Sequence, residues 1–396
     1  MDNNQKIMQI SDENIMNTYS RHAIVLKKGA GSVAVDNNNK EYLDVSSGIG
    51  VNSLGYCDPG FVKAVTLQLN TIQHVSNYYY NRQPAILAQQ LCSKSHFKKV
   101  FFGNSGAEAN ECAIKLARKY SFDKYGKDRN QIITLKNSFH GRTITTLSAT
   151  GQEDFHNYFF PFTEGFTCVT PNDIYEIKNM DLSHVCAFML EFIQGEGGIN
   201  ILYIDYVRQI AEICKNNDIL LIADEVQTGA GRTGRFYCFE HYNVQPDIAT
   251  LAKGLAGGLP IGACLCAEKL ANTLSAATHG TTFGGNPVSC AGANYVISTV
   301  YNDEFLNDVT KKGCYLASKL FKIKGIKSID YKGLMFGIEL YEDNAKETAQ
   351  KCVENGLLII TAKNKLRMLP PLNISYNELD KAAAILEAVI GGQSKS

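Results

Sequence analysis

Residues 220–229, with the sequence LLIADEVQTG, are the stretch that decides the fold. Their apolar first half predicts a buried β-strand that delivers Asp224 at its end. Because side chains alternate along a strand, Asp224 and Val226 are expected to point the same way. Further along, Lys253 ends a second short strand and begins the glycine-rich segment 253–258. A carboxylate and a lysine at two strand ends indicate a site at one edge of a sheet.

The middle of the chain alternates short β-branched or aromatic runs with longer helical patterns. This alternation is typical of crossover units that build a mainly parallel sheet, whose ligand crevice lies beyond the carboxyl ends of the strands. The candidate strands are Lys99–Phe102, Gln131–Thr134, Val185–Leu190, Ile219–Ala223, Asp247–Thr250 and Gly262–Cys266.

After about Pro287 the pattern changes to long amphipathic helices over 288–301 and 305–323, followed by an α+β stretch. The N-terminal stretch carries two short strands around Val33 and Tyr42 and is expected to pack with the C-terminal part. The α/β chain is therefore divided into an N-terminal segment (1–50), a large domain (51–300) and a small C-terminal domain (301–396).

The composition favours a soluble protein with small-molecule partners. Thirty-nine basic residues balance thirty-nine acidic ones, so no overall field attracts nucleic acid or an anionic membrane. The twelve cysteines show no C-x-x-C pair, which indicates reduced thiols without a metal site and hence the cytosol. The N-terminus lacks a signal-peptide pattern, and no apolar run approaches the roughly twenty residues of a membrane span.

Asp224 and Val226 are the pair of side chains that pyridoxal 5'-phosphate (PLP) requires. A carboxylate keeps the pyridine nitrogen protonated, an aliphatic side chain supports one ring face, and Gln227 could reach the phenolic oxygen. Lys253, desolvated beside a cationic ring, would supply the neutral amine for Schiff-base chemistry. A solvated surface lysine is the alternative, but Asp224 and the motifs below converge on one ligand.

Residues 101–110, FFGNSGAEAN, supply a strand, a glycine turn and a helix start. Backbone amides and the helix dipole at such a start bind an anion, and the Ser105 hydroxyl could add a hydrogen bond. The alternative is an ordinary N-cap and turn. The segment matches neither G-x-x-x-x-G-K-[ST] nor G-x-G-x-x-G, which makes a Rossmann-type oxidoreductase improbable.

Residues 138–142, SFHGR, combine an aromatic ring with a guanidinium. Phe139 could stack on the cofactor ring opposite Val226, and Arg142 offers the planar fork that grips a substrate carboxylate. The alternative is a core aromatic residue and a surface salt bridge. His140 is interpreted as structural, without a catalytic step.

Two further charged residues suit an acidic substrate. Glu196 lies in a glycine-rich loop after a buried strand, and Arg367 lies in an apolar segment near the C-terminus. A buried arginine needs an anionic partner, so Arg367 would pair with Glu196 or with a substrate carboxylate. Alternatively, Glu191 braces the loop and Arg367 forms a structural ion pair.

In this order the motifs resemble the class III (subgroup II) aminotransferases, and the match runs nearly end to end. The resemblance implies PLP fold type I, which is aspartate aminotransferase-like, with a mainly parallel seven-stranded sheet in the large domain and a smaller α+β domain. The residues that carry it are 104–111 (NSGAEANE), 139–142 (FHGR), 194–198 (QGEGG), 224–229 (DEVQTG), Lys253 and 279–287 (HGTTFGGNP).

The resemblance also implies roles for single residues. Lys253 would form the Schiff base, Asp224 would bind the pyridine nitrogen and Gln227 the phenolic oxygen. Ser105, Gly106 and Ala107 would bind the phosphate. Thr282 would reach the phosphate of the neighbouring subunit, which implies a homodimer.

Within the family, the segment 46–55 is similar to members that act on N2-acetylornithine, because Gly48 stands where ornithine-specific members carry a tyrosine. The implied reaction, part of arginine biosynthesis, transfers the δ-amino group to 2-oxoglutarate. Arg142 would hold the α-carboxylate of the donor, and Arg367, freed from Glu196, that of glutamate. Ornithine, succinylornithine and 4-aminobutyrate are alternative donors, and a non-catalytic PLP-binding protein is an alternative of another class.

Three departures from the family pattern stand out. Phe192 replaces a common proline, residues 56–59 (YCDP) replace a His-x-His-Pro-like turn, and Ala107 replaces a threonine. Only Ala107 would touch the cofactor. Its missing hydroxyl predicts at most weaker PLP retention.

Overall fold

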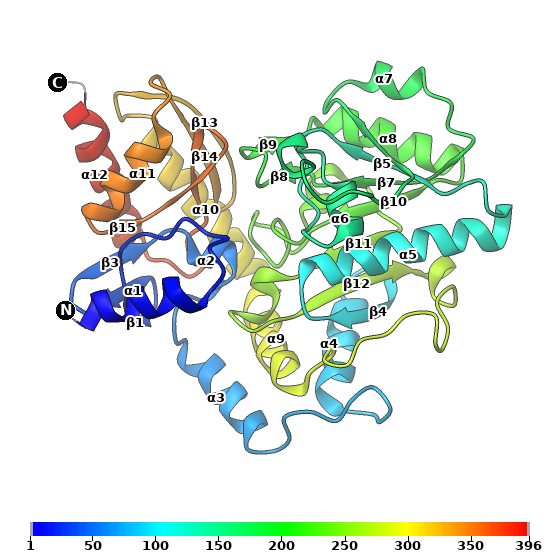
Figure 1. Cartoon of the computed structure of the whole chain (residues 1–396), viewed down its shortest axis with the longest axis horizontal. Helices are drawn as coiled ribbons and strands as arrows, with labels where there is room; N and C mark the ends of the chain where they lie inside the picture. Colours follow the sequence, from blue (N-terminus) through cyan, green and yellow to red (C-terminus); the bar gives the residue numbers. More distant parts are fainter. Residues whose placement is uncertain (1–2, 394–396) are drawn as a thin grey trace.

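A computed structural model describes residues 3–393 and is built around a seven-stranded sheet (Figure 1). The strand order is β4-β12-β11-β10-β7-β5-β6. Six strands run parallel and β12 runs antiparallel to both of its neighbours. The strands are β4 (Phe97–Gly103), β5 (Gln131–Leu135), β6 (Phe166–Val169), β7 (Val185–Leu190), β10 (Leu220–Asp224), β11 (Ile248–Leu251) and β12 (Gly262–Ala267).

The expected α/β sheet is thus confirmed, with one strand that the sequence analysis did not name. Six of the strands lie within a few residues of the predicted runs. Most are apolar runs buried on both faces of the sheet, whereas β4, at one edge, is only partly buried and exposes Lys98 and Lys99. The seventh, β6, is a half-buried edge strand of four residues. Helices α5 (Gly106–Tyr125), α6 (Ile144–Ala149), α7 (Ile174–Lys178) and α8 (Ile204–Asn216) accompany the sheet.

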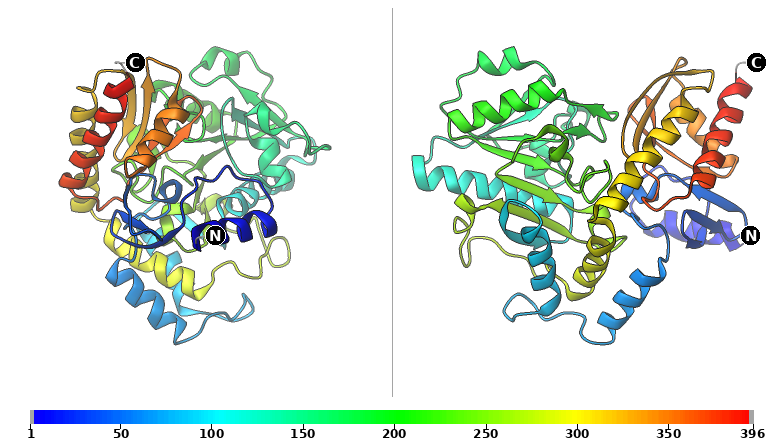
Figure 2. Two further views of the ribbon diagram at one scale, coloured as in Figure 1. Left: turned by 60° about the vertical axis from the view of Figure 1, so that its left-hand side comes forward. Right: turned by 180° about the vertical axis from the view of Figure 1, so that it is seen from behind.

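The two ends of the chain meet in a second group of sheets and helices, here called the second lobe. Parallel pairing of β3 with β15 joins the first fifty residues to the C-terminal part in one four-stranded sheet, β1-β2-β3-β15. A second sheet has the order β13-β14-β17-β16. Figure 2 shows this lobe beside the large sheet.

The strands of the second lobe are β1 (Leu26–Ala30), β2 (Val33–Asp36), β3 (Glu41–Asp44), β13 (Ile326–Lys332), β14 (Met335–Leu340), β15 (Leu357–Leu358), β16 (Ile360–Ala362) and β17 (Lys365–Met368). Its helices are α1 (Asn3–Asn14), α10 (Asp303–Leu320), α11 (Ala345–Glu354) and α12 (Tyr376–Gln393). The outermost residues of the predicted terminal segments, 1–2 and 394–396, lie outside the described residues.

Helix α9 (Pro287–Val300) joins the two parts of the chain. It packs against α3 (Pro59–Leu69) and α4 (Arg82–Ser93) beside the large sheet. The change of pattern near Pro287 therefore marks the start of a helix rather than the end of the large lobe. The division at residues 50 and 300 stays a proposal.

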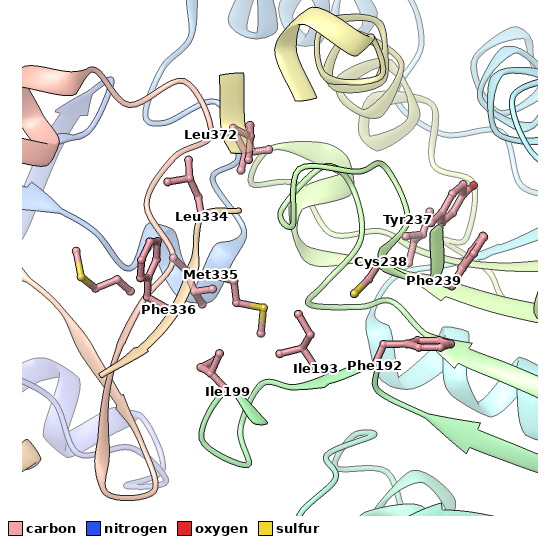
Figure 3. Close-up of a cluster of buried hydrophobic side chains, with 14 of the residues drawn as sticks. Phe192, Ile193, Ile199, Tyr237, Cys238, Phe239, Leu334, Met335, Phe336 and Leu372 are labelled. Atoms are coloured by element: carbon pink, nitrogen blue, oxygen red, sulfur yellow. The ribbon is translucent and has the colours of Figure 1, made fainter. Parts of the chain in front are cut away.

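One hydrophobic core runs through both lobes (Figure 3). Phe192, just after β7, and Phe336 of β14 belong to the same buried cluster. The ring of Phe192 lies 5.0 Å from that of Tyr242, whose hydroxyl donates to the Phe192 carbonyl oxygen at 2.9 Å. The phenylalanine that replaces the family proline therefore fills core volume.

The departure at residues 56–59 also has a structural account. The Tyr56 hydroxyl donates to the Asp44 carboxylate at 2.6 Å. Asp58 caps α3 by accepting a hydrogen bond from the Phe61 amide at 2.9 Å, and Pro59 occupies the first helical position, where no amide hydrogen is needed. The turn thus joins the N-terminal segment to α3.

None of the helices between residues 3 and 393 combines the length and the hydropathy needed to span a membrane.

Candidate active site

A cavity of about 400 Å³ lies beyond the carboxyl ends of the central parallel strands. This is where an open α/β sheet is expected to bind its ligand. Nine of the predicted site residues line it, namely Ser105, Gly106, Ala107, Phe139, Arg142, Asp224, Val226, Gln227 and Lys253.

Asp224 ends β10 and is held by hydrogen bonds from three sides. Its Oδ2 accepts from Asn110 Nδ2 and interacts with His140 Nδ1, each at 2.8 Å, and its Oδ1 accepts from the Val226 amide at 3.0 Å. The Asp224 side chain is 3% exposed. The carboxylate therefore has a fixed position before any ligand arrives.

Asn110 was not singled out by the sequence analysis, and His140 was interpreted as structural. Both side chains line the cavity and contact Asp224, although they come from separate elements, α5 and the loop after β5. Asn110 also donates to the His140 carbonyl oxygen at 2.7 Å. The two residues orient the carboxylate of Asp224.

The local structure around Val226 and Lys253 differs from the expected strand ends. Strand β10 stops at Asp224, so a turn rather than strand alternation brings Val226 to the cavity. Strand β11 stops at Leu251, and Lys253 begins a 3-10 turn with φ of +42°. A lysine in the left-handed region is strained, and such residues cluster at functional sites.

The Lys253 side chain reaches the cavity from a partly buried position. Burial lowers the pKa of its amine below the ordinary value, while the carboxylates of Glu196, Glu191 and Asp224 oppose this shift. A larger fraction of the Lys253 amine is therefore neutral, and the neutral amine is the nucleophilic form.

The N-terminus of α5 forms one end of the cavity. Ser105 is its N-cap. The amides of Gly106 and Ala107 lie in the first turn, where the helix itself offers no carbonyl acceptor, and both residues line the cavity. In the structure the Ser105 hydroxyl donates to Glu108 Oε2 at 2.9 Å and accepts from the Glu108 amide at 3.2 Å. The hydroxyl thus caps the first turn of the helix and would have to turn to reach a phosphate.

The residues around the cavity fit PLP. The helix start at Gly106 suits an anionic phosphate, the fixed carboxylate of Asp224 suits a protonated ring nitrogen, and Lys253 supplies an amine. In the cavity wall the Gly106 backbone packs closely against the Val226 side chain: a Cβ built on Gly106 would lie 2.6 Å from Val226 Cγ1. The cofactor would be held by these residues together with Phe139 and Gln227.

Gly106→Ala is expected to weaken PLP binding about tenfold or more, because the added methyl group overpacks the stiff Val226 side chain. Titration of the apoprotein with PLP, followed by absorbance, measures this. Gly391→Ala is the matched control, since its Cβ would have no neighbour within 4 Å. Equal affinities in the two variants would contradict the proposed cradle.

The two predicted substrate arginines are in different states. Arg367 is 3% exposed and binds the Glu196 carboxylate at both oxygens, at 2.7 and 3.2 Å, so the predicted ion pair is present. Burial would raise the pKa of Glu196, but Arg367 outweighs it and keeps this pKa below its usual value. Arg142 is exposed, and in the described part of the chain no carboxylate pairs with it.

Glu191 braces the loops that carry these groups. Its carboxylate accepts from the Phe139 amide at 2.8 Å and from the Gly195 amide at 3.1 Å. Burial raises the pKa of Glu191 to about 7. The bracing role is the alternative that the sequence analysis left open for this residue.

Thr282 does not line the cavity. It lies exposed in the segment before α9. The segment is tied to the large lobe by Asn77, which donates to the Gly284 carbonyl oxygen at 2.9 Å, and by Asn104, which donates to Thr281 Oγ1 at 3.2 Å. Thr282 contacts a phosphate only if it serves another copy of the chain.

Within residues 3–393, no group of three or more histidine, cysteine, aspartate or glutamate side chains is arranged to hold a metal ion.

The sequence and the fold are similar to those of known enzymes. The family model Aminotransferase class-III matches residues 15–390. Acetylornithine aminotransferases of Haemophilus ducreyi and Caldanaerobacter subterraneus are each 49% identical, covering 97% and 95% of this chain and 98% and 97% of theirs. N-acetylornithine aminotransferase from Stenotrophomonas maltophilia superposes with a TM-score of 0.84 at 32% identity, covering 98% of this chain and 99% of that one. An ornithine aminotransferase structure from Toxoplasma gondii, with PLP at partial occupancy in its active site, superposes with a TM-score of 0.93 at 30% identity, covering 99% of this chain and 95% of that one.

Proposed function

This chain belongs to the class-III aminotransferases, and from that premise we propose that it transfers the δ-amino group of N2-acetyl-L-ornithine to 2-oxoglutarate, a reaction of arginine biosynthesis. The observation that carries the substrate assignment is a pair of arginines. Arg142 lines the cavity and has no carboxylate partner among the described residues. Arg367 pairs with Glu196 beside the cavity and reaches the cavity residue Gln227 at 3.4 Å. The high identity to two enzymes named for this reaction supports it.

PLP supplies an electron sink for the carbon that carries the amino group. Asp224, fixed by Asn110 and His140, is placed to keep the ring nitrogen protonated. Phe139 and Val226 would support the two ring faces. The Lys253 amine is the group that takes a proton from the substrate carbon and returns it.

The two arginines account for two different substrates in one cavity. The amino donor has a single carboxylate, which the available guanidinium of Arg142 would bind with two parallel hydrogen bonds. Glutamate and 2-oxoglutarate carry a second carboxylate, which would displace Glu196 from Arg367. The ion pair thus shields the buried guanidinium of Arg367 while the donor is bound.

Gly48 supports an acylated donor. It lies in α2 (Ser47–Gly50), in which Gly48 and Ile49 adopt left-handed dihedral angles. The φ of Gly48 is +62°, and a Cβ there would meet no atom closer than 3.6 Å. The position therefore has no side chain to bind a free α-amino group.

The test is a comparison of kcat/KM for four donors: N2-acetylornithine, N2-succinylornithine, ornithine and 4-aminobutyrate. N2-Acetylornithine is expected to rank first. A preference for another donor would replace the substrate assignment and keep the reaction class. If none of the four bleached the visible absorbance of the holoprotein, the alternative of a non-catalytic PLP-binding protein would be favoured.

Glu196→Ala is expected to shift preference toward dicarboxylates, because Arg367 loses its partner. The ratio of kcat/KM for glutamate to that for N2-acetylornithine should rise about tenfold, since an unpaired buried guanidinium strongly favours a substrate carboxylate. Steady-state kinetics with both substrates measures the ratio. Glu347→Ala, on α11, is the control. An unchanged ratio would mean that the ion pair is only structural.

We also propose that the chain is a homodimer in which Thr282 completes the partner's phosphate site. Exposed aromatic side chains lie near the segment that carries it: Tyr78, Tyr79 and Tyr80 are 94%, 74% and 108% exposed and Phe283 is 62% exposed. Such a concentration is unusual for a monomer surface and suits an interface.

The dimer is tested by light scattering, with twice the chain mass of 43.6 kDa expected. Thr282→Asp, which repels a phosphate, and Lys253→Ala should each be inactive alone. Coexpressed, they should recover about a quarter of the activity, because mixed dimers contain one intact site. A mixture that stayed inactive would place Thr282 outside the partner's site.

The location follows from composition. All twelve cysteines are free thiols and eight are buried, which favours a reducing compartment. We propose a cytoplasmic enzyme with small-molecule partners, in keeping with its balanced charge.

A further inference from the structure

We propose that Phe155 is a positioning residue for Arg142, holding the guanidinium plane so that its N–H groups meet the carboxylate of the amino donor. The inference deepens the proposed function and rests on it, because Arg142 is taken as the residue that binds this carboxylate. Phe155 itself touches no substrate atom in this role.

The ring of Phe155 is the closest aromatic group to this guanidinium. Arg142 Cζ lies 3.9 Å from the centroid of the Phe155 ring and 5.6 Å from that of Phe139. The two rings contact each other edge to face, with centroids 6.3 Å apart and planes at 82°. Arg142 therefore lies over two rings that are nearly perpendicular to each other, that of Phe139, which lines the cavity, and that of Phe155.

This contact is compatible with carboxylate binding. An aromatic ring attracts the face of a guanidinium, whereas a carboxylate binds the N–H groups along its edge. Phe155 can thus hold Arg142 without occupying its hydrogen-bond donors. Because Arg142 is exposed and long, it would otherwise lose much conformational freedom when a ligand binds.

Phe155 is itself fixed. It ends the 3-10 turn η1 (Glu153–Phe155), and its amide donates to the Gln152 carbonyl oxygen at 3.1 Å. Gln152 is buried, and its side chain donates to the Ser138 carbonyl oxygen at 3.2 Å. On the other side, His156 Nε2 lies 2.7 Å from the Leu147 carbonyl oxygen. The backbone that carries the ring is therefore held on both sides of Phe155 in the sequence.

The neighbouring aromatic residues provide the contrast. Phe155 is half-buried, whereas Tyr158, Phe159 and Phe160 are exposed and contact one another or Phe162. Within the described residues, the rings that lie under the Arg142 guanidinium are those of Phe139 and Phe155, not those of these three. The position of Phe155 beside the cavity is specific to that residue.

The experiment measures binding of N2-acetyl-L-norvaline, a donor analogue without the δ-amino group, to the holoenzyme by calorimetry. Phe155→Leu should raise its Kd about five- to tenfold, and Phe155→Tyr, which keeps the ring, should leave it within about twofold. Phe159→Leu is the matched control. Phe155→Met replaces the leucine variant if that one does not fold, and the visible absorbance of the bound cofactor should stay unchanged.

A double-mutant cycle separates this inference from the proposed function. Arg142→Ala should weaken binding, and adding Phe155→Leu should weaken it no further. If Arg142→Ala left Kd unchanged, the proposed role of Arg142 would fail. If Arg142→Ala weakened binding but Phe155→Leu did not, only the role of Phe155 would be overturned. An equal loss from Phe155→Leu with and without Arg142 would overturn it as well.

Discussion

Lys253→Ala is expected to lower kcat by about 10⁴-fold or more, the largest effect of any single substitution in this chain. The side chain supplies both the nucleophile and the proton carrier, and no other lysine lines the cavity within the described residues. Burial lowers the pKa of its amine, which enlarges the neutral fraction that acts as nucleophile and accepts a proton.

Two measurements check this expectation. Steady-state turnover gives kcat, and borohydride treatment followed by mass spectrometry shows whether PLP becomes covalently attached to the peptide that contains residue 253. Lys351→Ala, an exposed position on α11, is the control for both. Normal turnover by the Lys253 variant would refute the assignment. Partial recovery by small primary amines would support a proton-carrying role.

Asp224→Asn is expected to lower kcat about 10³-fold, because it keeps the shape of the side chain and removes the negative charge that holds a proton on the ring nitrogen. If the asparagine oxygen stayed between Asn110 and His140, its Nδ2 would face the Val226 amide, which is also a donor. The substitution therefore removes the charge together with one hydrogen bond, and a companion variant has to measure the cost of a lost hydrogen bond alone.

Asn110→Ala is the companion variant, since it leaves the charge and removes one of the hydrogen bonds to Asp224. We expect a loss of about tenfold in kcat. Comparison of kcat for the two variants, at saturating PLP, separates the effect of the Asp224 charge from the effect of its orientation. If Asp224→Asn lost no more activity than Asn110→Ala, the carboxylate would serve only as a structural hydrogen-bond acceptor.

The large sheet was predictable because its strands are short apolar runs that end in glycine or in acidic residues. The central runs are buried on both faces, so a continuous apolar pattern suffices to locate them. The edge strand β4 is only partly buried, but its residues 100–102 still form an apolar run. Strand β6 was not predicted, because a half-buried edge strand of four residues shows little hydrophobic pattern in the sequence. The pairing of β3 with β15 was expected only as packing, since register between distant segments leaves no local signal.

The candidate site was predictable where one short segment carries several of its groups, as in 104–107 and 224–227. Asn110 and Phe155 act across the fold, on residues more than about ten positions away in the sequence, so no spacing reveals them. A weak signal existed for Asn110: it is a polar residue on the buried face of α5, between Ala109 and Cys112. A buried amide requires partners, and Asp224 and the His140 carbonyl oxygen supply them.

The pairing of β3 with β15 has a consequence for biosynthesis. Leu43 pairs with Leu357, so the first strands emerge from the ribosome long before their neighbour exists. At about 5–20 residues per second the delay is roughly 15–60 s. During that interval β3 is an open strand edge on a nascent chain. A polypeptide that terminates before residue 357 would keep this edge permanently, and such fragments are expected to aggregate or to require a chaperone.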